Sequence, residues 1–393
     1  MDFRLTEEER LIKEAAARFV NRELLSVEGS FLKQKEPFLP PGDPARRDLD
    51  PQIRNNLAGK ARHAGLWAPE LPESAGGSGL NHLARVLVYR EFGRTVLPFE
   101  PPAIPAVVAK SQSAKRIAAG ELSLSLAFHE LHNTGKADEI TASYRSSPEG
   151  FSLCCSGLDV FNPAADLFLL PAKEESSSRI SLFLLDKSDP ALSILDEVDL
   201  NTDQRVGALA VNESTLPPDG LMGDEEEIQK IIAGEQLRIA ARSLGIGSRC
   251  IEASLEHARN RVTFGRPLAS RQAVQWMLAD LAVSMRLATW LTLEAAWRAD
   301  QGWPYFEAAA LAKKKAARMA FEAADVAIQV HGGYGVCKEM PFEGFYRDSR
   351  LMRLLYGREV KIDRRIGEEF LRAGSKEQGA RNRRSEQGAR GRE

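Results

Sequence analysis

Cysteine is scarce in this sequence, with only four residues in a chain of 393. Cys154, Cys155, Cys250 and Cys337 include no C-x-x-C spacing and form no cluster with histidine. Structural zinc sites and redox dithiols use such spacings, so the pattern argues against either kind of site. Four cysteines are also too few for a disulfide scaffold in a chain of this length, which favours a reducing compartment.

Long apolar runs and targeting signals are missing as well. The sequence contains no run of about 18 apolar residues, the length that a membrane-spanning helix requires. It opens on acidic and polar residues, without the apolar core of a secretory signal or the acid-poor composition of a transit peptide. We therefore expect a cytoplasmic protein that has no membrane partner.

An excess of charge of either sign is also missing. Lys and Arg total 53 and Asp and Glu total 55, which leaves a net charge of -2. Proteins that bind nucleic acid or anionic membranes carry a clearly basic surface, so neither partner is expected. Hydrophobic residues make up 43% and charged residues 27% of the chain. This balance is typical of a globular protein, and the length allows several domains.

The patterns that are present divide the chain into three parts and a tail. Residues 1–118 predict a helical domain, because Thr6 and Glu9 form a capping-box start and apolar residues then recur at helical spacing. Residues 76–79 form a glycine cluster that we interpret as a connection between two helices. No strand precedes this cluster and no lysine follows it, as both would in a phosphate-binding loop.

Residues 119–224 predict a small, mainly antiparallel β domain. Short runs rich in β-forming residues are separated there by Gly, Pro, Asn, Asp and Ser. These runs cover residues 122–126, 139–144, 151–155, 166–170, 180–185 and 208–211.

Residues 225–374 predict a four-helix bundle, so the fold as a whole is mainly α. The acidic run 224–227 suits the first turn of a helix, where carboxylates oppose the helix dipole. Long helical segments are expected at roughly 226–260, 270–299, 304–332 and 360–372. Residues 375–393 contain two nearly identical polar segments, at 375–381 and 385–390, and no bulky apolar residue. We therefore expect a disordered tail.

One stretch beside a predicted helix carries the groups that a bound dinucleotide needs. Arg261, Thr263, Phe264 and Gln272 supply a cation, a hydroxyl, an aromatic ring and an amide close together in sequence. A guanidinium neutralises pyrophosphate, and a ring can stack on adenine. Taken singly, the arginine could be a surface cation and the phenylalanine a core residue.

A second stretch at the end of another predicted helix complements the first. Gln329 supplies an amide, and Gly332 and Gly333 allow backbone N–H groups to approach a ligand closely. Alone, the two glycines would suit a helix C-cap. Neither stretch is the G-x-G-x-x-G turn of nicotinamide-binding folds, so that class of protein has no support.

Together these two stretches resemble the flavin-contacting motifs of the acyl-CoA dehydrogenase family. The resemblance covers about residues 1–372, includes the helical, β and helical order of domains, and is strongest in the final third. It implies a flavoprotein of lipid metabolism that uses FAD, acts on an acyl-CoA and passes electrons to an electron-transfer flavoprotein.

The resemblance also assigns residues to the pyrophosphate and adenine half of FAD. They are Arg261, Thr263, Phe264, Gln272, Gln329, Gly332 and Gly333. In the family these groups serve a flavin that lies mainly in the partner subunit. The resemblance therefore implies at least a dimer, either a homodimer or homotetramer or a heterotetramer with a second family member.

The half of the flavin site that the β domain supplies departs from the family pattern. The family's loop beside the flavin ring is represented by residues 128–138, where few residues match. The next strand along the flavin edge corresponds to residues 158–166, and the resemblance places Phe161 and Asn162 beside the ring.

Family chemistry requires a carboxylate that removes the α-proton of the thioester, and most members carry it near the C-terminus. The equivalent position here is Tyr356. A phenol is a poor base at neutral pH because its ordinary pKa is about 10. The backbone N–H of Tyr356 can still donate a hydrogen bond to the thioester oxygen and stabilise the negative charge that develops there.

Members of the isovaleryl and long-chain type carry the base on an earlier helix, and that position here is Glu235. Three isoleucines on the same helical face would shield its carboxylate from water. The alternative is a structural carboxylate paired with Arg238 or Arg242. Those members usually have arginine after the glutamate, whereas Gln236 follows here. Glu359 is a further candidate only with a one-residue shift in register.

We therefore expect FAD-dependent α,β-dehydrogenation of an acyl-CoA thioester, with Glu235 as base and an electron-transfer flavoprotein as acceptor. Two alternatives stay open. The chain could be the non-catalytic partner subunit of a heterotetrameric acyl-CoA dehydrogenase, which the tyrosine at position 356 favours. It could also be a flavin oxygenase or oxidase on the same fold.

Overall fold

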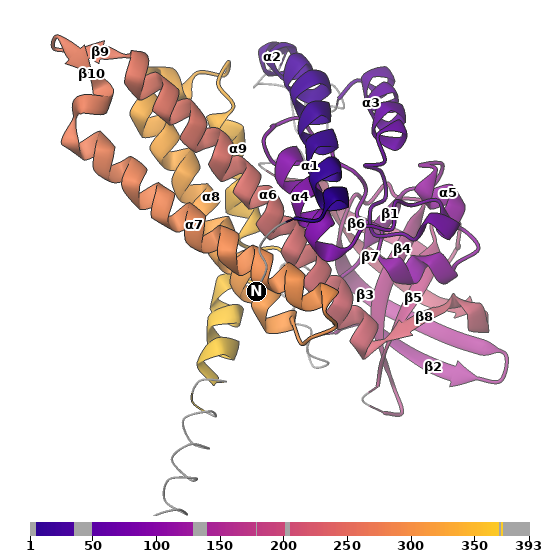
Figure 1. Ribbon diagram of the computed structural model, residues 1–393. Coiled ribbons are helices and arrows are strands. Elements are labelled where there is room, and N and C mark those ends of the chain that lie inside the picture. The colour runs from indigo at the N-terminus through magenta and orange to yellow at the C-terminus, as the bar shows by residue number, and fades with distance from the viewer. Residues whose placement is uncertain are drawn as a thin grey trace, which may run out of the picture.

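The computed structural model describes residues 5–34, 49–128, 140–177, 179–200, 205–368 and 371. Helices from both ends of the chain pack together, and a sheet from the middle of the chain lies against them (Figure 1). The predicted fold class is thereby confirmed. Most of the predicted flavin-ring loop at 128–138 and the predicted tail at 375–393 lie outside the described residues.

The N-terminal helices begin with the predicted capping box. The Thr6 hydroxyl accepts from the Glu9 N–H at 3.2 Å, and the Glu9 carboxylate accepts from the Thr6 N–H at 2.8 Å. The helices of this part are α1 (Glu7–Phe19), the π-helical turn η1 (Val20–Leu24), α2 (Leu25–Gln34), α3 (Pro51–His63), α4 (His82–Phe92) and α5 (Ala114–Ala118). The glycine cluster at 76–79 lies between α3 and α4, as predicted.

The middle of the chain forms one sheet with the strand order β6-β7-β3-β2-β4-β5-β8, and β1 pairs with β4. The strands are β1 (Leu124–Leu126), β2 (Ser143–Ser147), β3 (Gly150–Phe161), β4 (Leu167–Glu174), β5 (Ile180–Asp186), β6 (Leu192–Asp199), β7 (Arg205–Leu216) and β8 (Leu221–Asp224). Most pairs are antiparallel, but β4 runs parallel to β1 and β2. The sequence did not predict β6 or β8.

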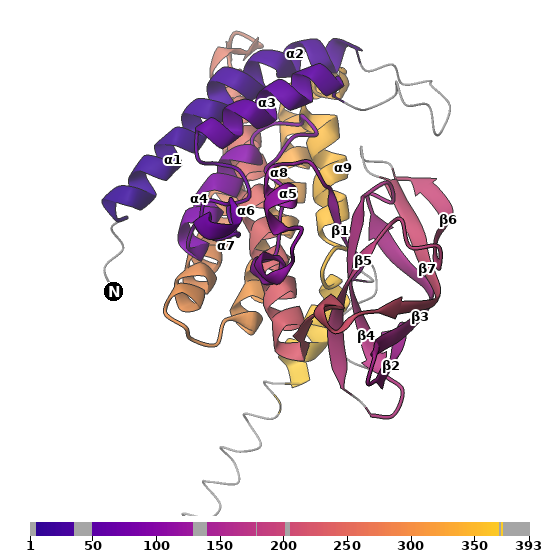
Figure 2. The same ribbon diagram turned by 90° about the vertical axis from the view of Figure 1, so that its right-hand side faces the viewer.

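Strand β4 connects the sheet to the helices because both of its faces are buried. Leu167 and Leu169 belong to the core that the sheet shares with the helices, whereas Phe168 and Leu170 belong to the core of the β domain itself. Side chains alternate across a strand, so one strand can contribute to both cores. The sheet and the helices therefore share one hydrophobic core (Figure 2).

The C-terminal part is built on three long helices, α6 (Glu225–Asn260), α7 (Gln272–Asp300) and α8 (Phe306–His331). Asp224 caps α6 by accepting from the N–H groups of Glu226 and Glu227, so the acidic run begins a helix as predicted. A hairpin of β9 (Val262–Thr263) and β10 (Arg266–Pro267) separates α6 from α7. None of the described helices combines the length and apolar character that crossing a membrane requires.

The structure has a helical segment at residues 359–368, where the sequence predicted a helix at 360–372. A further helix that the sequence did not predict, α9 (Phe342–Met352), packs on α8. Its buried residues Phe342, Phe345 and Met352 recur at helical spacing. The predicted domain boundaries fall at the end of α5 and at the start of α6, and they stay predictions.

Helix α4 approaches α6 very closely, and this brings residues of the N-terminal part of the chain next to α6. A Cβ atom added to Gly245 would lie 2.1 Å from the Arg90 carbonyl oxygen, and one added to Gly93 would lie 2.2 Å from that of Arg242. Only glycine leaves room for two backbones at this distance.

Candidate functional site

The first predicted cofactor motif lies on the hairpin that stands off the end of the bundle (Figure 1). Arg261 ends α6, with its N–H donating to the His257 carbonyl at 2.8 Å. Phe264 lies at the tip with a φ of 49°, and its side chain is 97% exposed. The guanidinium of Arg271 lies 5.7 Å from the Phe264 ring centre and donates to the Thr263 carbonyl at 2.6 Å.

The second predicted motif lies at the end of α8. Gln329 is exposed, and the helix ends where Gly332 takes a φ of 60°. Apart from each glycine and its chain neighbours, no heavy atom of the described residues lies within 4 Å of the position that a Cβ atom would take on Gly332 or Gly333. The backbone in this segment is therefore open to close approach by another molecule.

The two motifs meet through residues that the sequence analysis did not single out. The rings of His257 and His331 lie 4.3 Å apart between centroids. Beside them Ala258, Val274 and Val330 form a small buried cluster that joins the ends of α6 and α8 to the start of α7. Each histidine lies within four residues of a predicted motif, which was the available signal. Gln272, the first residue of α7, is exposed next to this junction.

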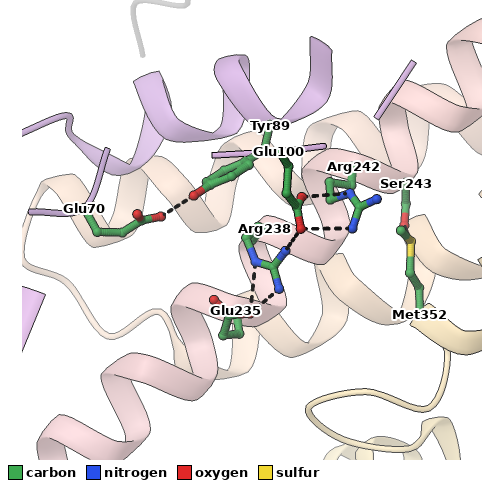
Figure 3. A network of polar contacts seen from close by, with 8 residues as sticks. All are labelled: Glu70, Tyr89, Glu100, Glu235, Arg238, Arg242, Ser243 and Met352. Atoms are coloured by element: carbon green, nitrogen blue, oxygen red, sulfur yellow. Dashed lines mark hydrogen bonds and ion pairs between the residues drawn. The ribbon is translucent and has the colours of Figure 1, made fainter. Parts of the chain in front are cut away.

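The predicted base, Glu235, is buried on α6 with an exposed fraction of 6%. Its Oε2 atom accepts two hydrogen bonds from Arg238, at 2.5 Å from Nη2 and 3.0 Å from Nε. Among the described residues no hydrogen bond reaches its Oε1 atom. The structure therefore contains the ion pair that the sequence analysis named as the alternative to a catalytic role (Figure 3).

Arg238 is shared between two carboxylates. Its Nη1 atom donates to Glu100 at 2.8 Å, and Glu100 also pairs with Arg242, whose Nε atom lies 3.2 Å from the carboxylate. Burial raises the pKa of Glu100, but the charges of Arg242 and Arg238 more than offset it, and the pKa lies below its ordinary value. The resulting network links Glu235, on α6, through Arg238 to Glu100 in the segment after α4, and so fixes the position of the Glu235 carboxylate.

Glu235 lines a cavity of about 620 Å³. The walls come from α4, the segment at 103–107, the first half of α6 and the connection between α7 and α8. Polar side chains in the lining include Glu70, Arg85, Tyr89 and Arg238. A cavity of this size is typical of small-molecule sites, which span roughly 300–1,000 Å³.

Tyr356 lies in a buried turn that is held against α6 and α8 and does not line that cavity. Its φ is 46° and that of Gly357 is 113°. Gln236 donates to the Tyr356 carbonyl at 2.7 Å, and the buried amine of Lys313 donates to the carbonyls of Gly357 at 2.6 Å and Arg353 at 3.1 Å. The residue after Glu235 in sequence therefore holds the turn that contains Tyr356.

The remaining predicted positions lie elsewhere. Phe161 ends β3 and packs on the core that the sheet shares with the helices, and Asn162 follows it with a φ of 57°. The Ser125 hydroxyl donates to the Phe161 carbonyl, which fixes this strand end. The Glu359 carboxylate accepts hydrogen bonds from Arg353 Nε at 2.6 Å and from Arg353 Nη2 at 2.8 Å. Glu359 does not line the cavity.

Two family models match this chain. They describe the acyl-CoA dehydrogenase N-terminal domain, at residues 6–111, and the acyl-CoA dehydrogenase C-terminal domain, at residues 226–369. The chain belongs to the acyl-CoA dehydrogenase family. Members of this family are flavin-dependent oxidoreductases that act on CH–CH groups, and FAD is their cofactor.

Relatives of known function and structure agree with this membership. The (R)-benzylsuccinyl-CoA dehydrogenase of Thauera aromatica is 27% identical over 91% of this chain and 94% of that protein. The FAD complex of PigA matches with a TM-score of 0.79 at 20% identity, over 94% of this chain and 99% of that one. The ChsE4-ChsE5 complex of Mycobacterium tuberculosis gives a TM-score of 0.78 at 24% identity, over 94% and 99%. At these identities the structural matches show the acyl-CoA dehydrogenase fold.

Proposed function

We propose that this chain carries out FAD-dependent α,β-dehydrogenation of an acyl-CoA thioester and passes the electrons to an electron-transfer flavoprotein. The observation that carries the proposal is Glu235, a buried carboxylate in the wall of a cavity of about 620 Å³. A base that removes a proton from carbon must face a pocket that excludes bulk water, and this is the arrangement on α6.

The residues at the end of the bundle fit the pyrophosphate and adenine half of FAD. They are Arg261, Thr263, Phe264, Gln272, Gln329, Gly332 and Gly333. An almost fully exposed ring at a hairpin tip and an open glycine backbone suit a ligand that lies on this surface. When bound, the flavin supplies the acceptor for the hydride that leaves the β-carbon.

The protein's own groups handle the proton and the thioester oxygen. Glu235 takes the α-proton on Oε1, while Arg238 holds Oε2 and so fixes the direction in which the carboxylate faces. The resemblance assigns the Tyr356 N–H as donor to the thioester oxygen, although Tyr356 lies outside the lining of the cavity beside Glu235. Phe161 and Asn162, at the end of β3, would flank the flavin ring when it is bound.

The exposed motif surface also supports an oligomer. A site formed by a hairpin tip and a helix end on the outside of one subunit is completed by a second subunit, either a copy of this chain or another family member. A cytoplasmic location fits the four cysteines, all of which are free.

One specific observation favours a second function, that of a non-catalytic partner subunit. The Glu235–Arg238 ion pair with N and O 2.5 Å apart is what a purely structural carboxylate would form, and tyrosine occupies the other base position. In that case the chain would complete a flavin site while another subunit supplied the base.

The visible spectrum and anaerobic bleaching of the purified chain test the proposal. We expect a yellow protein whose flavin is bleached by acyl-CoAs, and a Glu235→Gln variant that keeps its flavin but bleaches about 100-fold more slowly or worse. Glu256→Gln, an exposed glutamate on the same helix, is the matched control and should bleach normally.

Three outcomes would overturn parts of the proposal. A colourless chain that becomes active only with a second subunit supports the partner-subunit function. Normal bleaching by Glu235→Gln removes Glu235 as the base. Rapid reoxidation in air, with peroxide or an oxygenated product in stoichiometric yield, indicates an oxidase or oxygenase.

A further inference from the structure

A carboxyl group that the proposed reaction does not use lies in the wall of the same cavity. Glu70 comes from the segment between α3 and α4, and its Oε1 atom accepts a hydrogen bond from the hydroxyl of Tyr89 at 2.8 Å. Its Oε2 atom is buried and has no hydrogen-bond partner among the described residues. Figure 3 shows the Glu70 carboxyl pointing toward Tyr89 beside the network around Glu235.

This arrangement lowers the stability of the fold when no ligand is bound. Burial raises the pKa of Glu70 to about 7, although the charge of Arg85 and the hydrogen bond from Tyr89 lower it. A buried polar atom without a partner loses its hydration and gains nothing in return. Such atoms are rare in folded proteins, and a group that enters the cavity lined by Glu70 can supply its carboxyl with a further partner.

We infer that Glu70 and Tyr89 form a specificity site for an acyl group that carries a hydroxyl. This inference rests on the proposed function, since it assigns the cavity to the acyl chain of an acyl-CoA. A hydroxyl brought in by the acyl group would give the Glu70 carboxyl the partner that the protein does not supply. Glu70 and Tyr89 bind the acyl group and take no part in proton removal.

The charges around the cavity favour a neutral ligand group over a charged one. Most of the charges in the lining are already paired, Lys230 with Glu226 and Glu227, and Arg238 with Glu235. A charged ligand group would have to compete with these ion pairs. A hydroxyl carries no charge and can both donate to a carboxylate and accept from a carboxylic acid, so it suits Glu70 in either protonation state.

The size of the cavity agrees with a long or bulky acyl group. About 620 Å³ exceeds what a short acyl chain fills, and the lining extends from Glu235 to the connection at 299–306. A chain that enters past Glu235 can therefore carry its hydroxyl to Glu70 while its thioester stays near the base.

Binding of non-reactive probes tests the inference without reliance on turnover. The probes are S-alkyl-CoA thioethers of increasing chain length, each with and without a terminal hydroxyl, titrated by calorimetry into the flavin-loaded protein. We expect the hydroxyl to improve affinity by about tenfold or more at one or more lengths, as a hydrogen bond to a buried carboxyl does. Glu70→Leu should remove this advantage and bind the plain thioethers at least as tightly.

Further variants keep the test decisive. Glu70→Gln retains donor and acceptor atoms and should keep part of the advantage, and Tyr89→Phe, which removes the donor to Glu70, should reduce it even if Glu70→Leu fails to fold. Glu73→Leu changes an exposed glutamate on the same segment and should leave the advantage intact.

The possible failures are distinguishable. If plain thioethers bind but a hydroxyl brings no gain at any length, or if Glu70→Leu keeps the gain, the specificity site is wrong and the proposed function stands. If no thioether binds at all, the assignment to acyl-CoA fails, and the hydroxyl site fails with it.

Discussion

The side-chain amide of Gln236 donates a hydrogen bond to the backbone carbonyl of Tyr356, with the two atoms 2.7 Å apart. Both residues are buried, with exposed fractions of 4% and 5%. The bond joins α6, one residue after Glu235, to a turn in which Tyr356 and Gly357 both have positive φ. The neighbour of the proposed base Glu235 is therefore bonded directly to Tyr356, the other position at which the resemblance implies a base.

Replacing Gln236 should weaken that link and lower stability. Gln236→Leu removes the amide that donates to the buried Tyr356 carbonyl, which costs about 1–3 kcal/mol in the free energy of unfolding. Urea denaturation of the purified protein measures it. Gln275→Leu is the control, because Gln275 also donates to a backbone carbonyl, that of Ala269 at 2.9 Å, but on the exposed surface. Equal losses in the two variants would show that burial of the Tyr356 carbonyl does not matter.

Lys313 should make stability depend on pH in the alkaline range. Burial lowers the pKa of its amine from the ordinary 10.5 to about 7. Between these values the unfolded chain holds a proton that the folded chain has lost, so the free energy of unfolding rises with pH from about 7 to 10.5. Below about pH 7 both states are protonated and this contribution is constant.

Lys313→Met is the variant that checks this dependence. It removes the titrating amine and leaves the carbonyls of Arg353 and Gly357 without their donor, so the protein should be less stable above about pH 7, where the wild-type amine is neutral in the fold. The wild type should also gain more stability than the variant between pH 7 and pH 9, as urea unfolding at the two pH values will show. Parallel behaviour of the two proteins would mean that Lys313 keeps its proton in the fold.

The fold was predictable from sequence where the local signal was strong. The capping box at Thr6, the acidic start of α6 and the long helices α6 to α8 each have periodic patterns or end signals that survive without tertiary context. Strand β6 was missed because acidic residues interrupt its apolar run, and helix α9 was missed although its buried residues recur at helical spacing. Packing on α8 and pairing with β7 stabilise them, and neither interaction is visible in a single segment.

The sequence likewise predicts only part of the candidate site. The motif residues at 261–272 and 329–333 could be named because they are close together in sequence, but the ring contact between His257 and His331 that joins them could not. Glu70 reaches the cavity, and Glu100 reaches Arg238, only because α4 and its flanking segments lie close to α6. No pattern in either segment encodes that approach beyond two glycines whose partners are distant in sequence.

Gly245 tests how much this approach matters. Gly245→Ala would place a methyl group 2.1 Å from the Arg90 carbonyl oxygen, so α4 must move away from α6. We expect a loss of about 1–3 kcal/mol or more, the usual cost of overpacking, measured by thermal or urea unfolding. Gly234→Ala, on the same helix with nothing within 4 Å, should raise stability by up to about 1 kcal/mol because alanine favours helix. Two variants of the same sign would contradict the close crossing.

Phe264 offers a test that separates stability from cofactor binding. Its ring is 97% exposed, so Phe264→Ala should change the free energy of unfolding of the flavin-free chain by less than about 1 kcal/mol. If the ring stacks on adenine, the same change should weaken FAD binding by about tenfold or more, since stacking on a base is worth roughly 1–3 kcal/mol. Flavin fluorescence during titration of the apoprotein gives the affinity. Leu195→Ala, another exposed apolar residue but on β6, should leave FAD affinity unchanged. Unaltered FAD affinity in Phe264→Ala would remove the hairpin tip from the cofactor site, and the exposed ring would then need a protein partner as its explanation.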